Sequence, residues 1–486
     1  MSSYSSRPVV VNKLQPFVFQ RGGNRMLHLL LTAALIALNT GEAVCQDTTC
    51  PWAGVERILS RINPPLFPPR EYVITSYGAQ ADGVTDCSEA ISRAIQDCLR
   101  DGGGSVVVPQ GSFLCGPIHL QSNVNLHLAD GAVLKFSRDP ERYLPVVFTR
   151  WEGVECMNYS PLIYAFEQEN IAVTGDGTLD GQANDEFWWP WKGTQGQNEK
   201  EGKPDQKRGR DLLLSMGEKG IPVMQRTLGE GYCLRPNFVQ LYRCRNVLIE
   251  GVRIINSPMW EIHPVLCVNV TIQNVRIDSH GPNNDGCNPE SSKDVLIKDC
   301  VFNTGDDCIA IKSGRNNDGR RLNIPSENVV IQGCTFKDGH GGVTIGSEVS
   351  GGAWNIFAED CDFESPVLYS ALRIKSNAVR GGLIEHVYVR RFNVRLVGRA
   401  VVDIDLFYEE GKNGSYIPTV RNIGIEKMTV TSCKSAFNLV GYEEAPIRNI
   451  WFRDCRFENV TGGYVVKHVE GFSAVNTTIN GRELEP

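Results

Sequence analysis

The chain has 486 residues, which is enough for several average domains or for one long all-β solenoid. Hydrophobic residues make up 41% and charged residues 22%, and this balance excludes gross disorder. The net charge is −7 and no dense run of Lys and Arg occurs, which argues against nucleic acid as a partner because phosphate binding depends on clustered cations.

The first distinctive segment is residues 26–38, an apolar stretch that follows Arg21 and Arg25. Small residues come after it, at Gly41 and Ala43. This order is typical of a signal peptide, and the stretch is shorter than the roughly 20 residues that a membrane-spanning helix needs. A buried core helix is the alternative, and Met26 is a second candidate for the true start.

We therefore expect an N-terminal extension and signal peptide over residues 1–45 and a linker over 46–70. The protein is expected to be secreted or periplasmic, with no stable membrane span. One catalytic domain is expected over 71–486.

Residues 85–100 show helical spacing, with apolar side chains along one side and glycines at 102–104 to end the helix. We predict that this N-terminal helix caps the open end of the solenoid, which would otherwise expose unpaired backbone and apolar side chains. Strands are predicted to follow at 105–108 and 123–128.

Strand-like units recur from mid-chain onward, and their first residues are Asn246, Asn269, Asp294, Asn328, Asn355, His386, Asn422 and Asn449. Each unit alternates apolar and polar residues and then reaches a turn, without the 3.6-residue period of a helix. Strands that repeat every ~25–35 residues favour a right-handed parallel β-helix. A leucine-rich repeat is disfavoured because its leucine frame is missing, and a propeller blade needs about 40 residues.

The repeat lapses over residues 182–232, where we predict a large insertion. It contains Trp188, Trp189 and Trp191, followed by a charge-rich run at 199–210. Long excursions from a repeat are usually functional or disordered. The tryptophans are expected either to stack on sugars or to pack the insertion onto the solenoid.

The cysteines fall into two groups. Four recur at one position of the repeat, which favours free, buried thiols in the interior: Cys300, Cys334, Cys361 and Cys455. Export would allow disulfides elsewhere, with Cys45–Cys50 or Cys87–Cys98 as the candidate pairs. Five glycosylation sequons also occur, at Asn158, Asn269, Asn413, Asn459 and Asn476.

Candidate catalytic residues recur at the spacing of the coils. Asp285 precedes Asp306 by 21 residues, and Asp307 precedes His340 by 33. Arg373 follows His340 by a further 33 residues and lies two positions before Lys375. One face of the solenoid would then gather carboxylates, an imidazole and two cations.

Neighbouring carboxylates do not all ionise easily, so one of them acquires a raised pKa and can donate a proton. Glycoside hydrolysis needs such an acid beside an ionised carboxylate that activates water. A polar turn or a calcium site are the alternatives, and the nearby His and cations disfavour calcium.

Four motifs carry a family resemblance: PNNDG at 282–286, TGDDCIAIKSG at 304–314, DGHGG at 338–342 and RIK at 373–375. Together they resemble the signatures of glycoside hydrolase family 28, the polygalacturonase family. The opening SYGAQADG at 76–83 resembles the pectinase-like superfamily, and the likeness extends over about residues 72–480.

The resemblance implies a role for each matching residue. Asp306 would be the general acid, Asp285 and Asp307 would activate water, and His340 would support the acid. The substrate-binding residues would be Arg373, Lys375 and Asn283, with the two cations holding a galacturonate carboxylate. No metal and no cofactor are implied. Asn284 stands where the family usually has threonine, and we expect activity to survive this difference.

The implied activity is inverting hydrolysis of the α-1,4 bonds of polygalacturonan, a pectic polysaccharide. SPMWEIHPV at 257–265 and the insertion resemble exo-acting members. The alternatives are an endo-acting polygalacturonase, a rhamnogalacturonan hydrolase, a pectate lyase and a non-catalytic carbohydrate-binding β-helix. A monomer is expected.

Overall fold

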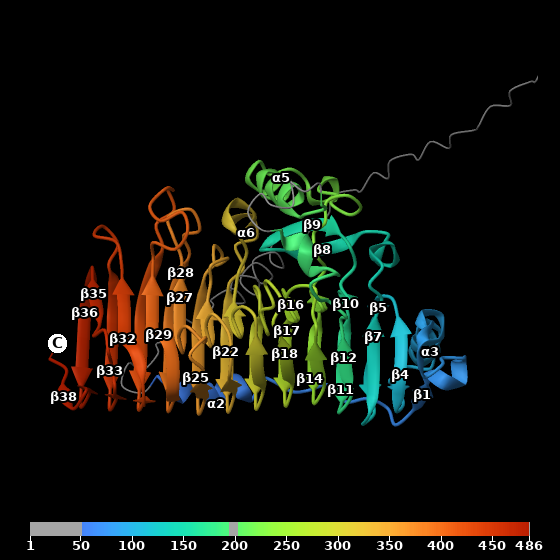
Figure 1. The fold of residues 1–486 in the computed structure, drawn as a ribbon, viewed down its shortest axis with the longest axis horizontal. Helices are drawn as coiled ribbons and strands as arrows, with labels where there is room; N and C mark the ends of the chain where they lie inside the picture. The colour runs from blue at the N-terminus through green and yellow to red at the C-terminus, as the bar shows by residue number, and fades with distance from the viewer. Residues whose placement is uncertain (1–50, 194–202, 486) are drawn as a thin grey trace, which may run out of the picture. The chain divides into compact units, whose positions relative to one another are not determined.

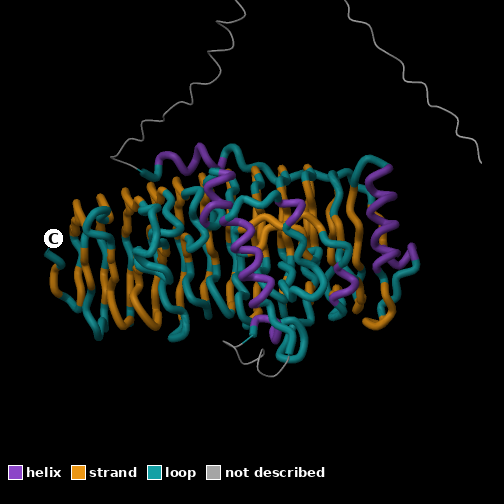
Figure 2. The backbone as a smooth tube through the Cα atoms, turned by 90° about the horizontal axis from the view of Figure 1, so that it is seen from above, coloured by secondary structure: helices purple, strands orange, loops and turns teal. Residues whose placement is uncertain are grey.

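A computed structural model describes residues 51–193 and 203–485, which all belong to one unit, Pro51–Pro486 (Figure 1). The predicted signal peptide and the candidate pair Cys45–Cys50 lie outside the described residues. Within this unit the chain winds into coils that stack as an elongated solenoid (Figures 1 and 2).

Each coil contributes strands to three long sheets, which we call A, B and C. Sheet A has thirteen described strands, in stacking order β1 (Glu71–Val73), β3 (Gly104–Val108), β6 (Val124–Leu128), β11 (Glu169–Gly175), β14 (Arg245–Glu250), β17 (Val268–Gln273), β19 (Lys293–Lys298), β22 (Ser326–Gln332), β25 (Ala353–Glu359), β28 (Leu383–Arg390), β30 (Thr419–Glu426), β33 (Ile447–Arg453) and β36 (Val469–Val475).

Sheet B contains β2 (Asp82–Asp86), β4 (Gly111–Cys115), β7 (Ala132–Phe136), β12 (Thr178–Asp180), β15 (Arg253–Ile255), β18 (Arg276–Ser279), β20 (Val301–Thr304), β23 (Thr335–Phe336), β26 (Asp362–Glu364), the first part of β29 (Asn393–Asp405), β31 (Thr429–Val430), β34 (Arg456–Phe457), β37 (Thr478–Ile479) and β38 (Arg482–Glu483). Sheet C contains β5 (Ile118–His119), β10 (Ile163–Phe166), β13 (Val239–Tyr242), β16 (Ile262–Val265), β21 (Ile309–Ile311), β24 (Val343–Ile345), β27 (Leu372–Lys375), the second part of β29, β32 (Cys433–Val440) and β35 (Val465–Lys467).

Strands that are neighbours in a sheet are parallel and one coil apart in sequence, as in β14 and β17, where Val247 pairs with Val270. Within the described residues the antiparallel pairs of strands are β37–β38 and a hairpin outside the solenoid. The predicted right-handed parallel β-helix is therefore confirmed.

The repeat seen in the sequence has a direct structural cause. The first residue of every repeat unit adopts a positive φ, from 53° at Asn246 to 60° at Asn269 for example. Asn and Asp tolerate this left-handed conformation better than most residues. Their side chains bond from coil to coil: the amide of Asn269 donates to Asn246 at 2.8 Å, and that of Asn246 donates to Asn170 at 2.9 Å. These ladders of side-chain bonds connect strands of sheet A at the left-handed position, which lies within each strand near its first residues.

The interior of the solenoid is apolar and stacked. Phe302, Phe336 and Phe363 lie on successive coils with ring centroids 5.5 and 4.7 Å apart. The four repeat cysteines are buried and free, as predicted. The candidate pair Cys87–Cys98 is wrong, because both thiols are free and pack in the core under the capping helix.

The N-terminal end is closed by α3 (Ser88–Arg100), which buries Ala90, Ile91, Ala94, Ile95 and Cys98. The predicted capping helix is thus confirmed. It begins three residues later than expected because Thr85 belongs to β2. A short 3-10 helix, η1 (Ile74–Tyr77), packs beside it.

Part of the expected linker is ordered, which differs from the prediction. The helix α2 (Ala53–Leu59) lies along the outside of sheet A, with Trp52 and Ile58 packed against Phe357 and Tyr388. Arg61 adds an ion pair to Asp294 at 2.6 Å. The outer face of sheet A carries these apolar side chains, and the N-terminal segment covers them.

A second layer lies over one side of the solenoid (Figures 1 and 2). Its elements are the hairpin β8 (Val147–Trp151) and β9 (Val154–Asn158), and the helices α5 (Lys207–Glu218) and α6 (Asn316–Leu322). Three 3-10 helices also occur: η2 (Pro140–Tyr143), η3 (Trp189–Lys192) and η4 (Val223–Gln225). Trp151, Leu213 and Trp260 share a small core that joins this layer to the solenoid.

The predicted insertion forms much of that layer. Trp188 is buried and packs edge-on against Tyr143 and Trp191, while the Trp189 indole donates to the Ser257 carbonyl at 2.9 Å. The tryptophans therefore pack the insertion onto the solenoid, which was one of the two expectations. The core of this segment is aromatic because it has no repeat of its own to stack upon.

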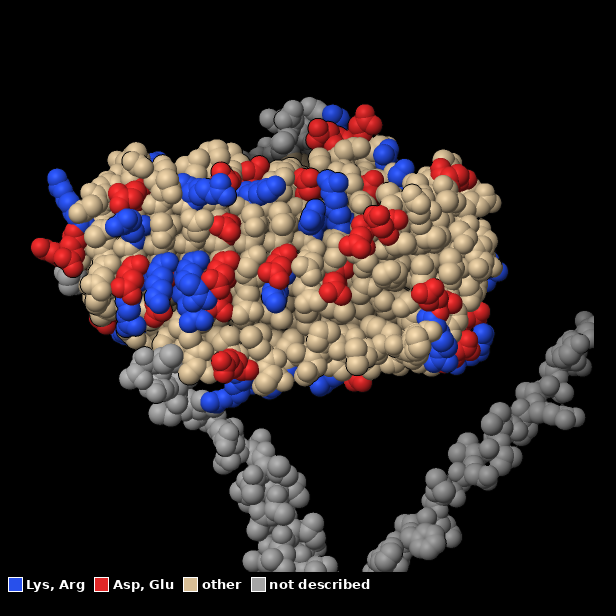
Figure 3. Space-filling view, turned by 90° about the horizontal axis from the view of Figure 1, so that it is seen from below, with Lys and Arg blue, Asp and Glu red and all other residues tan. Residues whose placement is uncertain are grey.

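Acidic and basic side chains lie next to one another over the surface in Figure 3. Many of these charges form ion pairs between coils, such as Arg421 with Glu385 at 2.6 Å. This face therefore offers no broad patch of one sign to a charged polymer. None of the helices within 51–193 and 203–485 is long and apolar enough to cross a lipid bilayer.

Candidate active site

The predicted catalytic residues come from loops at one edge of sheet C. Asp285 lies in the coil between β18 and β19, and Asp306 and Asp307 lie between β20 and β21. His340 lies between β23 and β24, one coil further along. Since Ile309 pairs with Val343, the two coils place Asp306 beside His340. The structure thus brings the four residues together.

Asp307 is held rigidly at the centre of the cluster. Its Oδ2 accepts a hydrogen bond from Lys375 Nζ at 2.6 Å, and its Oδ1 accepts one from Thr344 Oγ1 at 3.2 Å. Arg373 Nη1 lies 3.8 Å from the same Oδ1. The side chain of Asp307 is only 2% exposed, so it is fixed by these partners more than by solvent.

Asp306 is the carboxylate that faces the cleft. Its side chain is 22% exposed, against 4% for Asp285. Its Oδ1 lies 2.9 Å from Nδ1 of His340. This hydrogen bond and the nearby carboxylates raise the pKa of His340. A group that must reach a substrate oxygen has to be accessible, and Asp306 meets that condition.

Asp285 is more deeply buried than Asp306 and has different partners. Asn288 donates to its Oδ2 at 3.1 Å, and Lys312 Nζ lies 3.5 Å from the same atom. Burial, and then the charge of Asp306, raise the pKa of Asp285. Burial also opposes ionisation of Asp306, but the hydrogen bond and charge of His340 outweigh it and hold the pKa of Asp306 low. These opposite pKa shifts favour placing the proton that the two groups share on Asp285 rather than on Asp306.

That outcome refines the sequence-based expectation. One carboxylate of the cluster has a raised pKa, and burial contributes more to this shift than the crowding on which the sequence-based expectation was founded. It is Asp285, whereas the resemblance assigns proton donation to Asp306. The two groups interact, so the pair titrates together and its proton moves with small changes in the surroundings.

The spacing argument for Arg373 is wrong in detail. Arg373 pairs in register with Thr344, and Tyr369 lies beside His340 in the next coil, with ring centroids 4.6 Å apart. Arg373 reaches the cluster because its side chain is long: Nη1 lies 3.4 Å from the His340 carbonyl oxygen. The prediction of proximity holds, although the coil-to-coil position differs.

Asn283 and Asn284 have separate tasks. Asn283 lies at the edge of the cleft, where its Oδ1 accepts a hydrogen bond from Arg235 at 2.8 Å. Asn284 is fully buried and accepts bonds from Gly281 N and Ser279 Oγ at 2.8 and 2.7 Å. The departure at Asn284 therefore falls on a residue that shapes the loop below Asp285.

A cavity of about 120 Å³ adjoins the aspartates. Its floor includes Asp285, Asp306 and Asp307, and its far wall comes from the second layer, through Glu152 of the β8–β9 turn, Lys192 of η3 and Arg210 of α5. The other lining residues are Trp260, Asn283, Lys312, Arg315, Ser347, Glu348, Lys375, Tyr408 and Glu409. The lining is almost wholly polar.

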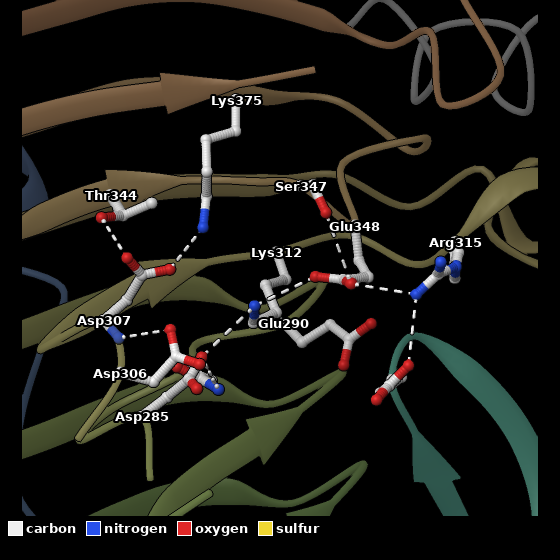
Figure 4. A network of polar contacts seen from close by, with 12 residues as sticks. Asp285, Glu290, Asp306, Asp307, Lys312, Arg315, Thr344, Ser347, Glu348 and Lys375 are labelled. Carbon is white, nitrogen blue, oxygen red and sulfur yellow. Dashed lines mark hydrogen bonds and ion pairs between the residues drawn. The ribbon is translucent and has the colours of Figure 1, made fainter. Parts of the chain in front are cut away.

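Sequence reasoning missed the charged network that continues from the aspartates to this wall (Figure 4). Lys312 bonds Glu348 at 3.0 Å, and Arg315 lies 3.4 Å from Glu348 and 3.3 Å from Glu152. Arg210 Nε completes it with a bond to Glu152 at 2.7 Å. Lys312 belongs to the TGDDCIAIKSG motif and could have been found, but Glu152 and Arg210 show no recognisable pattern.

Lys312 also bears on the calcium alternative, because its ammonium lies among the carboxylates. Among the residues that the structure describes, no group of three or more His, Cys, Asp or Glu side chains is arranged to hold a metal ion. Lys312 further packs over the ring of Trp260, with Nζ 4.6 Å from the centroid.

Comparisons with known proteins agree with this geometry. Residues 229–478 match the family described as "Glycosyl hydrolases family 28". A solved exopolygalacturonase from Thermotoga maritima is 45% identical, with a TM-score of 0.85, over 88% of this chain and 96% of that one. A probable polygalacturonase from Vitis vinifera is 28% identical over 78% of this chain and 72% of its own length. An exo-poly-alpha-D-galacturonosidase from Dickeya chrysanthemi is 26% identical, over 81% and 67%.

Proposed function

The chain belongs to glycosyl hydrolase family 28, and from this premise we propose that it hydrolyses the α-1,4 bonds of polygalacturonan from the non-reducing end, with inversion. The observation that carries this proposal is the cavity beside Asp306, whose far wall is built by the insertion and the β8–β9 turn. The described relatives include exo- and endo-acting enzymes, so the cavity is what favours the exo mode.

Asp306 is proposed as the proton donor. It is the most accessible of the three aspartates. Before substrate binds, contact with solvent and with His340 stabilises its negative charge. A sugar ring that covers it removes water and disfavours the charged form, while Asp285 keeps Lys312 at 3.5 Å. The shared proton therefore passes to Asp306, which donates it to the leaving glycosidic oxygen.

Asp285 and Asp307 are then both ionised and face the position of a water molecule on the opposite side of the scissile bond. One of the two accepts a proton from this water as the water oxygen bonds to the anomeric carbon and the glycosidic bond breaks, while the other holds the water by a hydrogen bond. Attack from the face opposite to the leaving group inverts the anomeric configuration. Lys375 and Thr344 orient Asp307 for this step.

The substrate is a polyanion, so its carboxylates need local cations. Arg373 is proposed to hold the galacturonate on the leaving side, where it lies beside His340 and is 12% exposed. Lys375 is the second cation, although its ammonium is already bonded to Asp307. Asn283 is proposed to form a hydrogen bond with a hydroxyl group of the sugar at the edge of the cleft.

We also propose that the protein is secreted or periplasmic and acts as a monomer. The signal-like stretch at residues 26–38 supports export, and a pectic polymer is a substrate found outside the cell. One chain supplies every side chain of the site, so the proposed chemistry does not require a second copy.

A time course on polygalacturonic acid tests the proposal. We expect reducing ends to rise with galacturonate as the early product while viscosity changes little, and proton NMR of the first product should show the β-anomer. An early fall in viscosity with mixed oligomers would contradict the exo mode. An unsaturated, ultraviolet-absorbing product would contradict hydrolysis.

A further inference from the structure

The cavity beside Asp306 contains one basic side chain that differs from the rest. Of its five cations, four each contact a carboxylate at 2.6 to 3.5 Å: Arg210, Lys312, Arg315 and Lys375. Lys192 lines the same cavity, yet it forms no hydrogen bond or ion pair with the residues that the structure describes.

Lys192 is also held in place. It ends η3, whose first turn is anchored by the buried Trp188 and by the bond from Trp189 to Ser257. The backbone of Gln206 returns to this segment and donates to the Trp191 carbonyl at 2.7 Å. The side chain therefore lines, from a fixed base, the same cavity as the three aspartates.

An ammonium that has no counterion among the described residues is unfavourable at a partly buried position. Burial lowers the pKa of Lys192, and the cations Arg235 and Arg210 act in the same direction. The charges of Glu152 and Asp306 act in the opposite direction, but Glu152 is already bonded to Arg210 and Arg315. A ligand that brings a negative charge to this wall would restore the balance.

We propose that Lys192 binds the carboxylate of the terminal galacturonate and so selects a uronic acid at the non-reducing end. This inference rests on the proposed exo mode, which places the terminal sugar in the cavity. Lys192 is thus a specificity-determining residue supplied by the insertion. Arg373 and Lys375, near His340 and Asp307, are left for the sugar on the leaving side.

The test compares trigalacturonate with the same trisaccharide methyl-esterified only at its non-reducing residue. We expect the wild type to prefer the free acid by about 10- to 100-fold in kcat/KM, the range of a hydrogen bond to a charged group. Lys192→Met should reduce this preference to about threefold or less, mostly by raising KM for the free acid. Lys192→Arg should retain most of it.

Lys219→Met is the matched control, because Lys219 is exposed at the end of α5, and it should keep the full preference. An undiminished preference in Lys192→Met, with galacturonate still the first product, would overturn the assignment of Lys192 alone. A wild type that shows no preference would overturn it as well. Internal oligomers as the first wild-type products would instead refute the exo mode, which product size reports independently.

Discussion

Nδ1 of His340 lies 2.9 Å from Oδ1 of Asp306, although the two residues are 34 positions apart in the chain. The β-helix makes them neighbours because successive coils stack at about 4.8 Å. Tyr369, one coil further, stacks on the imidazole and keeps its plane fixed. The bond orients Asp306 toward the cleft and ties its charge to that of His340.

Asp306→Asn should lower kcat roughly 10²- to 10⁴-fold, the usual contribution of general acid catalysis. An amide cannot donate the proton that the leaving oxygen needs. Reducing-end release from polygalacturonic acid measures this, and circular dichroism should report an unchanged fold. Asp130→Asn, at an exposed position, is the control and should keep full activity. Near-normal turnover by Asp306→Asn would remove Asp306 as the acid.

The pair also makes stability depend on pH. Folding raises the pKa of His340 because of Asp306, so the stabilisation is complete below the unfolded-state pKa and is lost as pH rises through the folded-state pKa. The Tm of the wild type should therefore exceed that of His340→Asn by more at pH 5.5 than at pH 9. An equal difference in Tm at the two pH values would show that the charged pair adds nothing to stability.

Lys312→Met should destabilise the protein by about 3–5 kcal/mol, the usual effect of removing one partner of a buried ion pair. The change leaves Asp285 and Glu348 without their shared cation. Chemical denaturation measures it. Adding Glu348→Gln should recover part of the loss, because one of the two stranded charges disappears. A double variant as unstable as the sum of both single variants would contradict this pairing.

Arg373 and Lys375 should differ kinetically, although both are assigned to substrate binding. Arg373→Gln should raise KM about tenfold or more through a lost charge-assisted bond. Lys375→Gln should mainly lower kcat, because Lys375 bonds Asp307 at 2.6 Å and orients it. Steady-state kinetics on trigalacturonate separates the two. The same KM effect in both variants would mean that Lys375 also acts chiefly on the substrate.

Trp188→Ala should lower the free energy of unfolding by about 3–5 kcal/mol, as expected for truncating a buried tryptophan. Because Trp188 anchors the segment that carries Lys192, the cavity wall should loosen. The variant should then release more oligomers and lower the viscosity of polygalacturonic acid faster per bond cleaved. Phe113→Ala serves as the control, because Phe113 is also buried but lies in the core of the solenoid. It should lose stability and still release galacturonate.

The sequence predicted the solenoid well because its signal is repeated in every coil. Asn246 and Asn269 mark the same turn, and Phe302 and Phe336 mark the same interior position. The clustered aspartates Asp285, Asp306 and Asp307 could be predicted because they lie in contiguous motifs. The second layer has no such periodicity. Glu152 and Arg210 meet across 58 residues through a hairpin and a helix that occur once each.

Two features could not be predicted from the sequence, for different physical reasons. The coils vary in length, so the interval of 33 residues from His340 to Arg373 does not give the register, and the residue that stacks on His340 is Tyr369. Residues 51–62 were predicted to be part of a linker. Their apolar side chains fit the outer face of sheet A, and only the folded structure reveals that surface. Neither the spacing of residues along the chain nor their composition is enough to predict the register at Arg373 or the packing of residues 51–62.

The asparagine ladder has a further effect on how the protein could be produced. Asn269 is a glycosylation sequon, yet its amide donates to Asn246 and to the Asn63 carbonyl, at 2.8 and 2.9 Å. Asn158 is buried and Asn269 is partly buried with two bonds from its amide, so a eukaryotic secretory host would find exposed acceptor asparagines only at Asn413, Asn459 and Asn476 among the five sequons. All three lie in the C-terminal coils, so any oligosaccharides would be confined to that end of the solenoid, away from the insertion.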